Sequence, residues 1–261
     1  MIIPQELIDV DFSQDPRAGT KTRETAYGTV FRTFADTGLT VIPRSQWPEL
    51  CEQAEDNPLE ANVQRIMNQG QEGSCASNAS SQCMETVTFV QGGSDLYVPL
   101  SAISLYKQVG SSPNSGSTID GNLRALQTTG ILPLDTPENR ERFQAVMSHT
   151  GFYKSYPANW KETAKLFRAD EWFDLNSFDQ VATCTFVGFP ICYGRAGHAI
   201  CGMRIVREVN RYLLKYANSW GSWGENGYGY DSESAISGAI RSYGAWGLRS
   251  TVIPDLGVPS V

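Results

Sequence analysis

The sequence predicts an α+β fold in which helices and strands are segregated into two lobes. Over residues 75–90 small and apolar residues recur at spacings of three and four, which is typical of a helix. From about residue 180 the chain contains β-branched and aromatic runs broken by glycine or asparagine, as expected for strands. A helical stretch followed by a strand-rich stretch favours segregated lobes over an alternating α/β sheet.

The first part of the chain is predicted to hold an extension followed by helices. Residues 1–40 have no regular pattern and are broken by proline and glycine, so we expect an extension there rather than a folded domain. A helix is predicted over 75–90, where small and apolar residues share one face. A second helix is predicted over 119–129, ended by Gly130 and Pro133. The stretch 137–170 is rich in charge and aromatic residues and is expected to form short helices and loops.

The last part of the chain is predicted to hold strands. Three runs have the composition of strands: VATCTFVGF, AICGMRIVREV and RYLLKYAN. The predicted organisation is therefore an extension over 1–40 and one main domain over 41–261. Within that domain we expect a helical lobe over about 70–175 and a β-rich lobe over about 176–255, completed by 41–68.

Composition excludes several classes of protein. The 261 residues are 41% hydrophobic and 19% charged, which is typical of a globular chain. A net charge of −7 argues against binding to a phosphate backbone, so no nucleic-acid partner is expected. No apolar run approaches the ~18 residues of a membrane span, so no membrane partner is expected. The beginning, MIIPQELIDVDF, lacks the pattern of a secretory signal.

Cysteine and histidine usage argues against disulfides and metals. Six cysteines allow three disulfides, but in a chain of this length without a signal free thiols are the better expectation. No CxxC pair occurs and there are only two histidines, so no metal and no cofactor are predicted.

Three short motifs carry chemistry. NQGQEGSCASNA, residues 68–79, places Cys75 after a glycine-bearing turn at a predicted helix start, with Gln69 six residues upstream. His198 stands in GRAGHAICGM, before a strand-like run, and Asn218 stands in YANSWGSWGENGYGY, after the next run. Two adjacent antiparallel strands would bring this imidazole and this amide together.

The order of NQG–GSC, then GHA, then NSWGSWGENGY resembles the papain family of cysteine peptidases. VIPRSQW at 41–47 is similar to the start of the family's mature domain, and YGAWGLRS at 243–250 is similar to its closing strand. The resemblance covers roughly 41–255. It implies a papain-like two-lobed fold, with a helical left lobe, an antiparallel β-barrel right lobe and the active-site cleft between them.

The resemblance also implies a role for each matching residue. Cys75 would be the nucleophile, favoured as a thiolate by the helix N-terminus and by a nearby imidazolium. His198 would carry the proton, and Asn218 would orient its ring. Trp220, which is grouped with the substrate-binding residues, would shield that hydrogen bond from water. The Gln69 amide and the Cys75 backbone N–H would form the oxyanion hole.

Other positions bear on substrate binding or depart from the family. By the resemblance, Gly116 would offer its backbone to the substrate. Thr251 would close the main side-chain pocket and favour apolar or aromatic substrate side chains. Glu72 and Trp246 stand where the family usually has cysteines, which is typical of a reduced, intracellular setting. Ala76 replaces a usual aromatic residue and leaves specificity on the leaving-group side open.

The extension adds a further departure and leaves alternatives open. Residues 1–40 are shorter than the family's usual inhibitory propeptide and lack a readable propeptide motif. The leading hypothesis is a cysteine endopeptidase of the phage or bacterial kind, cytoplasmic or virion-associated, that acts on a peptide or protein substrate. One alternative is a papain-fold structural or interaction protein, for example a component of a virion or another larger assembly. Another is a different cysteine acyl-transfer enzyme, such as a cell-wall amidase. His149, in MSHTGF, is expected to be a loop histidine without a catalytic role.

Overall fold

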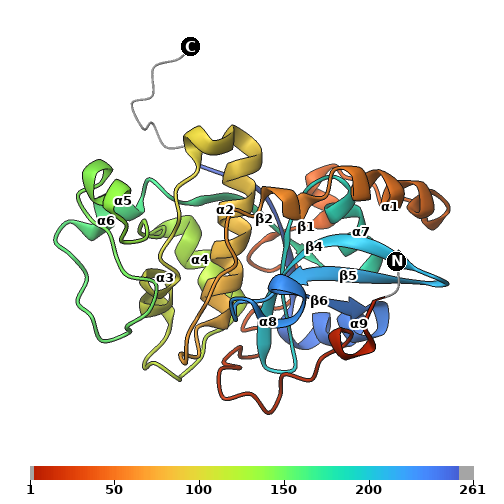
Figure 1. Cartoon of the computed structure of the whole chain (residues 1–261), viewed down its shortest axis with the longest axis horizontal. Coiled ribbons are helices and arrows are strands. Elements are labelled where there is room, and N and C mark those ends of the chain that lie inside the picture. The colour runs from red at the N-terminus through yellow and green to blue at the C-terminus, as the bar shows by residue number, and fades with distance from the viewer. Residues whose placement is uncertain (1–2, 253–261) are drawn as a thin grey trace.

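A computed structural model describes residues 3–252 of the chain. The helices are α1 (Trp47–Asp56), α2 (Cys75–Leu96), α3 (Ala102–Val109), α4 (Ile119–Thr128), α5 (Pro137–Arg142), α6 (Trp160–Ala164), α7 (Phe178–Phe186), α8 (Trp223–Asn226) and α9 (Glu233–Tyr243). The strands are β1 (Arg32–Thr33), β2 (Ala169–Leu175), β3 (Ile191–Arg195), β4 (His198–Glu208), β5 (Arg211–Ala217), β6 (Tyr228–Ser232) and β7 (Ala245–Thr251). Helices α3–α6 gather at one end of the molecule and the sheet lies at the other, with α2 between them (Figure 1). The α+β class predicted from the sequence is confirmed.

The strands form one open sheet of seven strands in the order β1-β2-β7-β3-β4-β5-β6. β1 pairs with β2 in parallel, and every other neighbouring pair is antiparallel. A closed barrel was expected for this lobe. Within residues 3–252 the two outer strands, β1 and β6, do not pair with one another, because β1 is only two residues long and offers too short a ladder.

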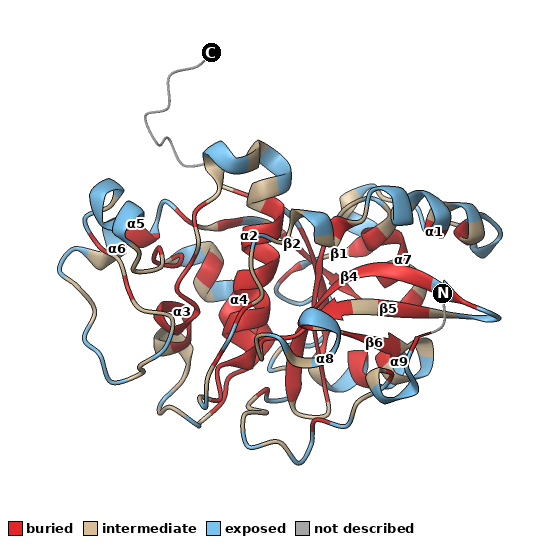
Figure 2. Cartoon of the chain, in the orientation of Figure 1, coloured by how far each residue is buried: buried red, intermediate tan, exposed pale blue. Residues whose placement is uncertain are grey.

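Helix α2 is the structural centre of the molecule. Its first thirteen residues, Cys75–Val87, are all buried, and Figure 2 shows the helix enclosed along most of its length. It packs on α3 and α4 on one side and on β4 and β7 on the other. Small side chains such as Ala76, Ala79 and Ser80 allow this close approach from both sides. The position of Cys75 is therefore set by both lobes at once.

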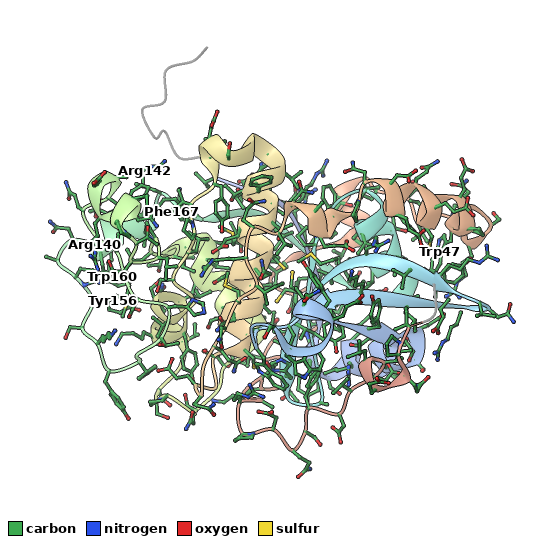
Figure 3. All side chains as sticks on the ribbon, in the orientation of Figure 1. Trp47, Arg140, Arg142, Tyr156, Trp160 and Phe167 are labelled. Carbon is green, nitrogen blue, oxygen red and sulfur yellow. The ribbon has the colours of Figure 1, made fainter. Side chains whose placement is uncertain are left out.

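Each lobe also has apolar packing of its own. In the sheet lobe, Trp47 of α1 is fully buried and meets Phe178 of α7 edge-on, at 5.9 Å between ring centroids. In the helical lobe, Tyr156 and Trp160 stack with centroids 4.0 Å apart. Figure 3 shows these two aromatic groups at opposite ends of the molecule. The lobes are thus supported separately, and they meet along α2.

The structure departs from the sequence prediction at two places in the sheet lobe. The run 181–189, predicted as a strand, lies mostly in helix α7. Ser177 caps that helix, since its hydroxyl accepts the Gln180 N–H at 3.3 Å, and burial against the sheet outweighs the β-propensity of the run. The expected lobe boundary near residue 175 also differs, because β2 pairs with β7 and belongs to the sheet. Residues 253–255 of the predicted β-rich lobe, and the rest of the domain to 261, lie outside the described residues.

The Ser177 cap generates a stability prediction. Replacing Ser177 with alanine leaves the Gln180 N–H without its partner, so the free energy of unfolding should fall by about 1 kcal/mol. Ser177→Asp, which keeps an acceptor at the N-cap, should retain most of the stability. Urea denaturation followed by circular dichroism measures both variants. Equal midpoints for Ser177→Ala and the wild type would contradict the capping role.

Candidate active site

Cys75, His198 and Asn218 are brought together by three elements. Cys75 is the first residue of α2, and His198 is the first residue of β4, on which α2 packs. Asn218 directly follows β5, whose last residue, Ala217, pairs with Cys201 of β4. The antiparallel register therefore brings the imidazole and the amide to the same end of the sheet, beneath the helix N-terminus.

The histidine ring is held in one orientation by Asn218. His198 Nε2 lies 2.7 Å from Asn218 Oδ1. The Ser219 N–H donates to the same oxygen at 2.7 Å. This oxygen is therefore an acceptor, and the histidine Nε2–H is the donor of the His198–Asn218 bond. The Trp220 ring covers this pair, with its centroid 4.7 Å from that of His198. His198 Nδ1, the ring nitrogen that Asn218 leaves free, is buried and has no hydrogen-bond partner among the described residues.

The surroundings of Cys75 favour its thiolate. Burial alone raises the pKa of this thiol, because a charge is poorly solvated there. Interaction with the neighbouring His198 ring and its positive charge, together with hydrogen bonds from Thr20 and Gly19, more than offsets burial. The pKa falls from the ordinary value of 9.0 to about 7. Such an arrangement can supply a nucleophilic sulfur at neutral pH.

Gln69 lies beside this group and is fully buried. Its Oε1 accepts the Ser219 hydroxyl at 2.6 Å and the Trp220 Nε1–H at 3.2 Å, which fixes the orientation of the amide. Its Nε2 donates to the backbone carbonyls of Arg17 at 2.9 Å and Glu72 at 2.7 Å. A preorganised N–H donor of this kind can donate a hydrogen bond to a carbonyl oxygen and stabilise the negative charge that develops there.

The carbonyl of Arg17 belongs to a segment that crosses the cleft, residues 12–25, called here the N-terminal strap. The Gly19 N–H lies 3.4 Å from Cys75 Sγ, and the Thr20 hydroxyl lies 3.0 Å from it. The Thr20 N–H donates to the Gly197 carbonyl, next to His198, at 2.7 Å. The strap thus places hydrogen-bond donors around the sulfur. The carbonyl that Gln69 binds belongs to Arg17, two residues before Gly19.

Glycines permit this close contact. The strap pairs in parallel with the segment around Ser117, whose N–H and carbonyl bond to Gly19 and Lys21 at 3.0 and 3.1 Å. A Cβ at Gly116 would lie 1.9 Å from the Gly19 carbonyl oxygen, and a Cβ at Gly19 would lie 2.4 Å from the Gly73 carbonyl oxygen. Gly116, predicted to offer its backbone, therefore allows the approach, and Ser117 makes the backbone hydrogen bonds.

The two ends of the strap are anchored by aromatic and ionic contacts. Phe12 is 1% exposed, and its ring centroid lies 4.6 Å from that of His198 and 5.3 Å from that of Trp220. The Arg17 guanidinium lies over the Trp220 ring, 3.8 Å from its centroid. At the far end, Arg23 forms a salt bridge of 2.6 Å with the buried Asp174.

Thr251 is not part of this group. It ends β7, pairs with Ala169, and donates its hydroxyl to Gln91 Oε1 at 2.6 Å. Gln91 lies about 24 Å along α2 from Cys75 at the rise of an α-helix. The structure therefore places Thr251 away from Cys75, and the pocket-closing role predicted for it is not supported.

Tyr243, the last residue of α9, lies beside Gly194 and near Thr20 of the strap. A Cβ at Gly194 would lie 2.8 Å from Tyr243 Cβ, 3.2 Å from Ile119 Cδ1 and 3.2 Å from Thr20 Cγ2. The missing side chain of Gly194 therefore leaves the space that Thr20 of the strap fills. Neither this set nor the strap was found by sequence reasoning, because the extension has no motif and the contact of Tyr243 with Gly194 joins segments far apart in the chain.

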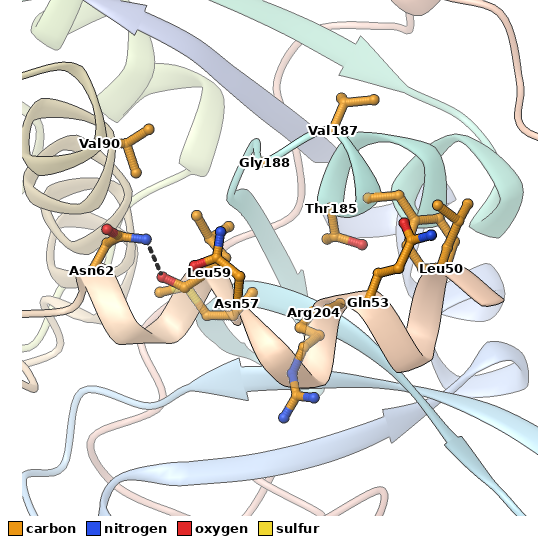
Figure 4. A pocket seen from close by; sticks show the side chains of 13 residues that line it. Leu50, Gln53, Asn57, Leu59, Asn62, Val90, Thr185, Val187, Gly188 and Arg204 are labelled. Carbon is orange, nitrogen blue, oxygen red and sulfur yellow. Dashed lines mark hydrogen bonds between the residues drawn. The ribbon is translucent and has the colours of Figure 1, made fainter. Parts of the chain in front are cut away.

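A separate surface pocket has no part in this site. It has a volume of about 380 Å³ and lies between α1, the end of α7 and α2, near Asn57, Val90 and Val187 (Figure 4). None of the residues of the Cys75 group lines it. Among residues 3–252, no group of three or more histidine, cysteine or acidic side chains is arranged to hold a metal ion. No helix in that part of the chain has the length and apolar character needed to cross a membrane.

Comparison with solved structures identifies proteins with a similar fold. Similar folds include xylellain, a cysteine protease from Xylella fastidiosa, at 17% identity over 71% of this chain and 82% of that one, with a TM-score of 0.56. Digestive procathepsin L2 proteinase from the larval midgut of Tenebrio molitor is 16% identical over 89% of this chain and 79% of that one, with a TM-score of 0.65. Procathepsin B S9 from Trypanosoma congolense is 14% identical over 92% and 89%, with a TM-score of 0.61.

These likenesses define the fold: the chain has the papain-like cysteine protease fold, as the resemblance of its motifs implied. No family model matches the sequence, and a search of curated proteins finds no match. The activity of this chain therefore has to be argued from its own residues.

The lowered pKa of Cys75 generates a pH prediction. The thiolate should appear with a midpoint near pH 7, because the folded-state pKa lies below the ordinary value. In His198→Ala the favourable charge is lost while burial remains, so the midpoint should rise above about 8.5. The ultraviolet absorbance of the thiolate, measured against Cys75→Ser, gives the midpoint. Burial raises the pKa of Cys51, Cys83 and Cys184, so these thiols should not interfere. An unchanged midpoint in His198→Ala would contradict the pairing.

Proposed function

We propose that this protein is a cysteine endopeptidase that is stored in a blocked state. The observation that carries the proposal is the continuous group of Cys75, His198 and Asn218, with the Gln69 amide beside it. A thiol of lowered pKa, an imidazole with one nitrogen held at 2.7 Å by an amide, and a fixed N–H donor are the parts that acyl transfer requires. The papain-like fold supports the same reaction class.

Each group would have a distinct part in the reaction. The Cys75 thiolate attacks the carbonyl carbon of a peptide bond, and the carbonyl electrons move to the oxygen, where Gln69 Nε2–H and the Cys75 N–H stabilise them. The C–N bond then breaks as His198 gives its proton to the leaving amine, and a thioester remains on Cys75. A water molecule gives its proton to His198 and attacks the thioester, which releases the acid and restores the thiolate. Asn218 keeps the ring in place throughout.

The N-terminal strap would prevent this reaction until it moves. The Arg17 carbonyl occupies the Gln69 donor, and Gly19 and Thr20 occupy the hydrogen-bonding range of the sulfur. The strap presents an N–H and a hydroxyl to Cys75 while its carbonyl at Gln69 belongs to another peptide unit, so it has the arrangement of a blocker and not of a substrate. Two of the similar structures are described as procathepsins, which is consistent with a latent form.

Turnover of a peptide library tests the activity. The wild-type chain should cleave slowly, and Cys75→Ala should abolish cleavage because the attacking sulfur is gone. Gln69→Ala should lower kcat by about 10²–10³ because one oxyanion donor is lost. Cleavage products are identified by mass spectrometry. Cleavage that persists in Cys75→Ala, or its absence from every chain that has Cys75, would sink the peptidase proposal and favour a structural role for the fold.

Displacing the strap tests the blocked state. In Gly19→Val the new side chain would meet the Gly73 backbone, so the strap should leave the cleft and Cys75 should be alkylated at least about tenfold faster at pH 7. Thr22→Ala, at an exposed strap residue, serves as the control and should leave the rate unchanged. Labelling of the Cys75 peptide by iodoacetamide, followed by mass spectrometry, gives both rates. If Gly19→Val and Thr22→Ala label alike, the strap does not control access.

A further inference from the structure

The loop that carries Gln69 is held between the two lobes. This loop, residues 67–74, is called here the oxyanion loop. Toward the sheet lobe, the Gln69 N–H donates to the Ser219 carbonyl at 2.9 Å, and the Gly221 N–H donates to the Met67 carbonyl at 3.1 Å. These bonds set one edge of the loop. They leave the opposite edge, which faces the helical lobe, to be held by other groups.

That opposite edge is held by residues 148–152. The Asn68 N–H donates to His149 Nε2 at 3.2 Å. Four residues along the loop, Glu72 Oε1 accepts the N–H groups of Gly151 and Phe152 at 3.1 and 2.9 Å. One imidazole and one carboxylate thus tie the loop to the same segment from both of its ends. Gln69 lies between the two ties.

The segment that makes these ties is itself fixed to the helical lobe. The Ser148 carbonyl accepts the hydroxyl of the buried Ser101 at 2.6 Å. Just before it, the Met147 N–H donates to the Pro133 carbonyl at 3.0 Å, and its carbonyl accepts the Asp135 N–H at 2.8 Å. The His149 ring is therefore presented to the oxyanion loop from an anchored backbone.

We propose that His149 is a positioning residue for the oxyanion site, acting through Asn68 on Gln69. A neutral imidazole accepts the hydrogen bond of the Asn68 N–H. This bond keeps the next residue, Gln69, in the position from which its amide can donate to the carbonyl oxygen of a substrate. This inference rests on the proposed peptidase function and extends it to a second histidine. Glu72, where the papain family usually has a half-cystine, fastens the other end of the loop without a covalent bond.

A histidine in this position makes the site sensitive to acid. Only the neutral ring has a lone pair for the Asn68 N–H, because both nitrogens of an imidazolium are donors. Burial and the positive charge of Arg65 lower the pKa of His149 from 6.5 to about 4. The charged groups on the elements around it are Arg65, Glu72 and Lys154. Since the folded-state pKa is lowered, the tie is complete above about pH 6.5 and is lost as the pH falls through about 4.

Kinetics in the Gly19→Val chain, whose strap is displaced, test the positioning role. His149→Leu, which has no acceptor, should lower kcat roughly tenfold and leave KM within about twofold, because a slightly misplaced donor weakens transition-state binding. His149→Gln, whose amide oxygen can accept the Asn68 N–H, should restore kcat. Its activity should also fall less steeply than that of the parent chain between pH 5 and about 3.5. Tyr153→Leu, at a nearby side chain that is 83% exposed, is the matched control and should match the parent chain.

Hydrogen exchange gives a readout that does not need turnover. In the Cys75→Ala chain at pH 7, amides of the oxyanion loop should exchange at least about tenfold faster with His149→Leu, and His149→Gln should restore their protection. Faster loop exchange in His149→Leu without any peptide turnover in Cys75-containing chains would support the positioning role and reject the proposed function. Loop exchange and kcat that are the same in His149→Leu as in Tyr153→Leu would overturn the positioning role, whether or not the protein is a peptidase.

Discussion

The packing of helix α2 between the two lobes is the constraint on which the rest of the structure depends. Its small buried residues let α3 and α4 approach from one side and β4 and β7 from the other. Cys75 at its beginning is therefore directed at the first residue of β4, His198, while its neighbour strand delivers Asn218. A larger residue in the first turns of α2 would separate the lobes and, with them, the sulfur from the imidazole.

The N-terminal strap lies directly against Cys75 and Gln69. Its hydrogen bonds are those of an extended chain, made to Ser117 on one side and to Gly197 on the other. Glycine at 19 and at 116 removes the side chains that would keep these backbones apart. The contacts of Phe12 and Arg23 at the two ends give the strap an affinity that does not depend on the reacting groups. In the proposed function, blocking and catalysis can therefore be altered independently.

The oxyanion loop is held by hydrogen bonds. One of its ties is made by Glu72, which stands where the papain-family pattern usually has a cysteine. Two backbone N–H groups bind the Glu72 carboxylate, and charge-assisted bonds of this kind are among the stronger hydrogen bonds of a protein. His149 completes the support with an acceptor that exists only in its neutral form. This support depends on pH because it needs a neutral His149, whereas a covalent link at the same place would not.

The sequence alone was sufficient for the parts of this protein that depend on local pattern. The spacing in α2 predicted the helix, and the order of NQG–GSC, GHA and NSWG identified Gln69, Cys75, His198 and Asn218, which the structure brings into one group. Tertiary structure decided the rest. The run 181–189 is helical because it is capped by Ser177 and buried against the sheet. Thr251 lies away from Cys75 because it pairs with Ala169 of β2 and its hydroxyl bonds to Gln91. The strap and the role inferred for His149 depend on contacts between segments far apart in the chain, such as Gly19 with Cys75 and Asn68 with His149. No local periodicity or motif encodes such pairs, because their partners are chosen only when the lobes pack.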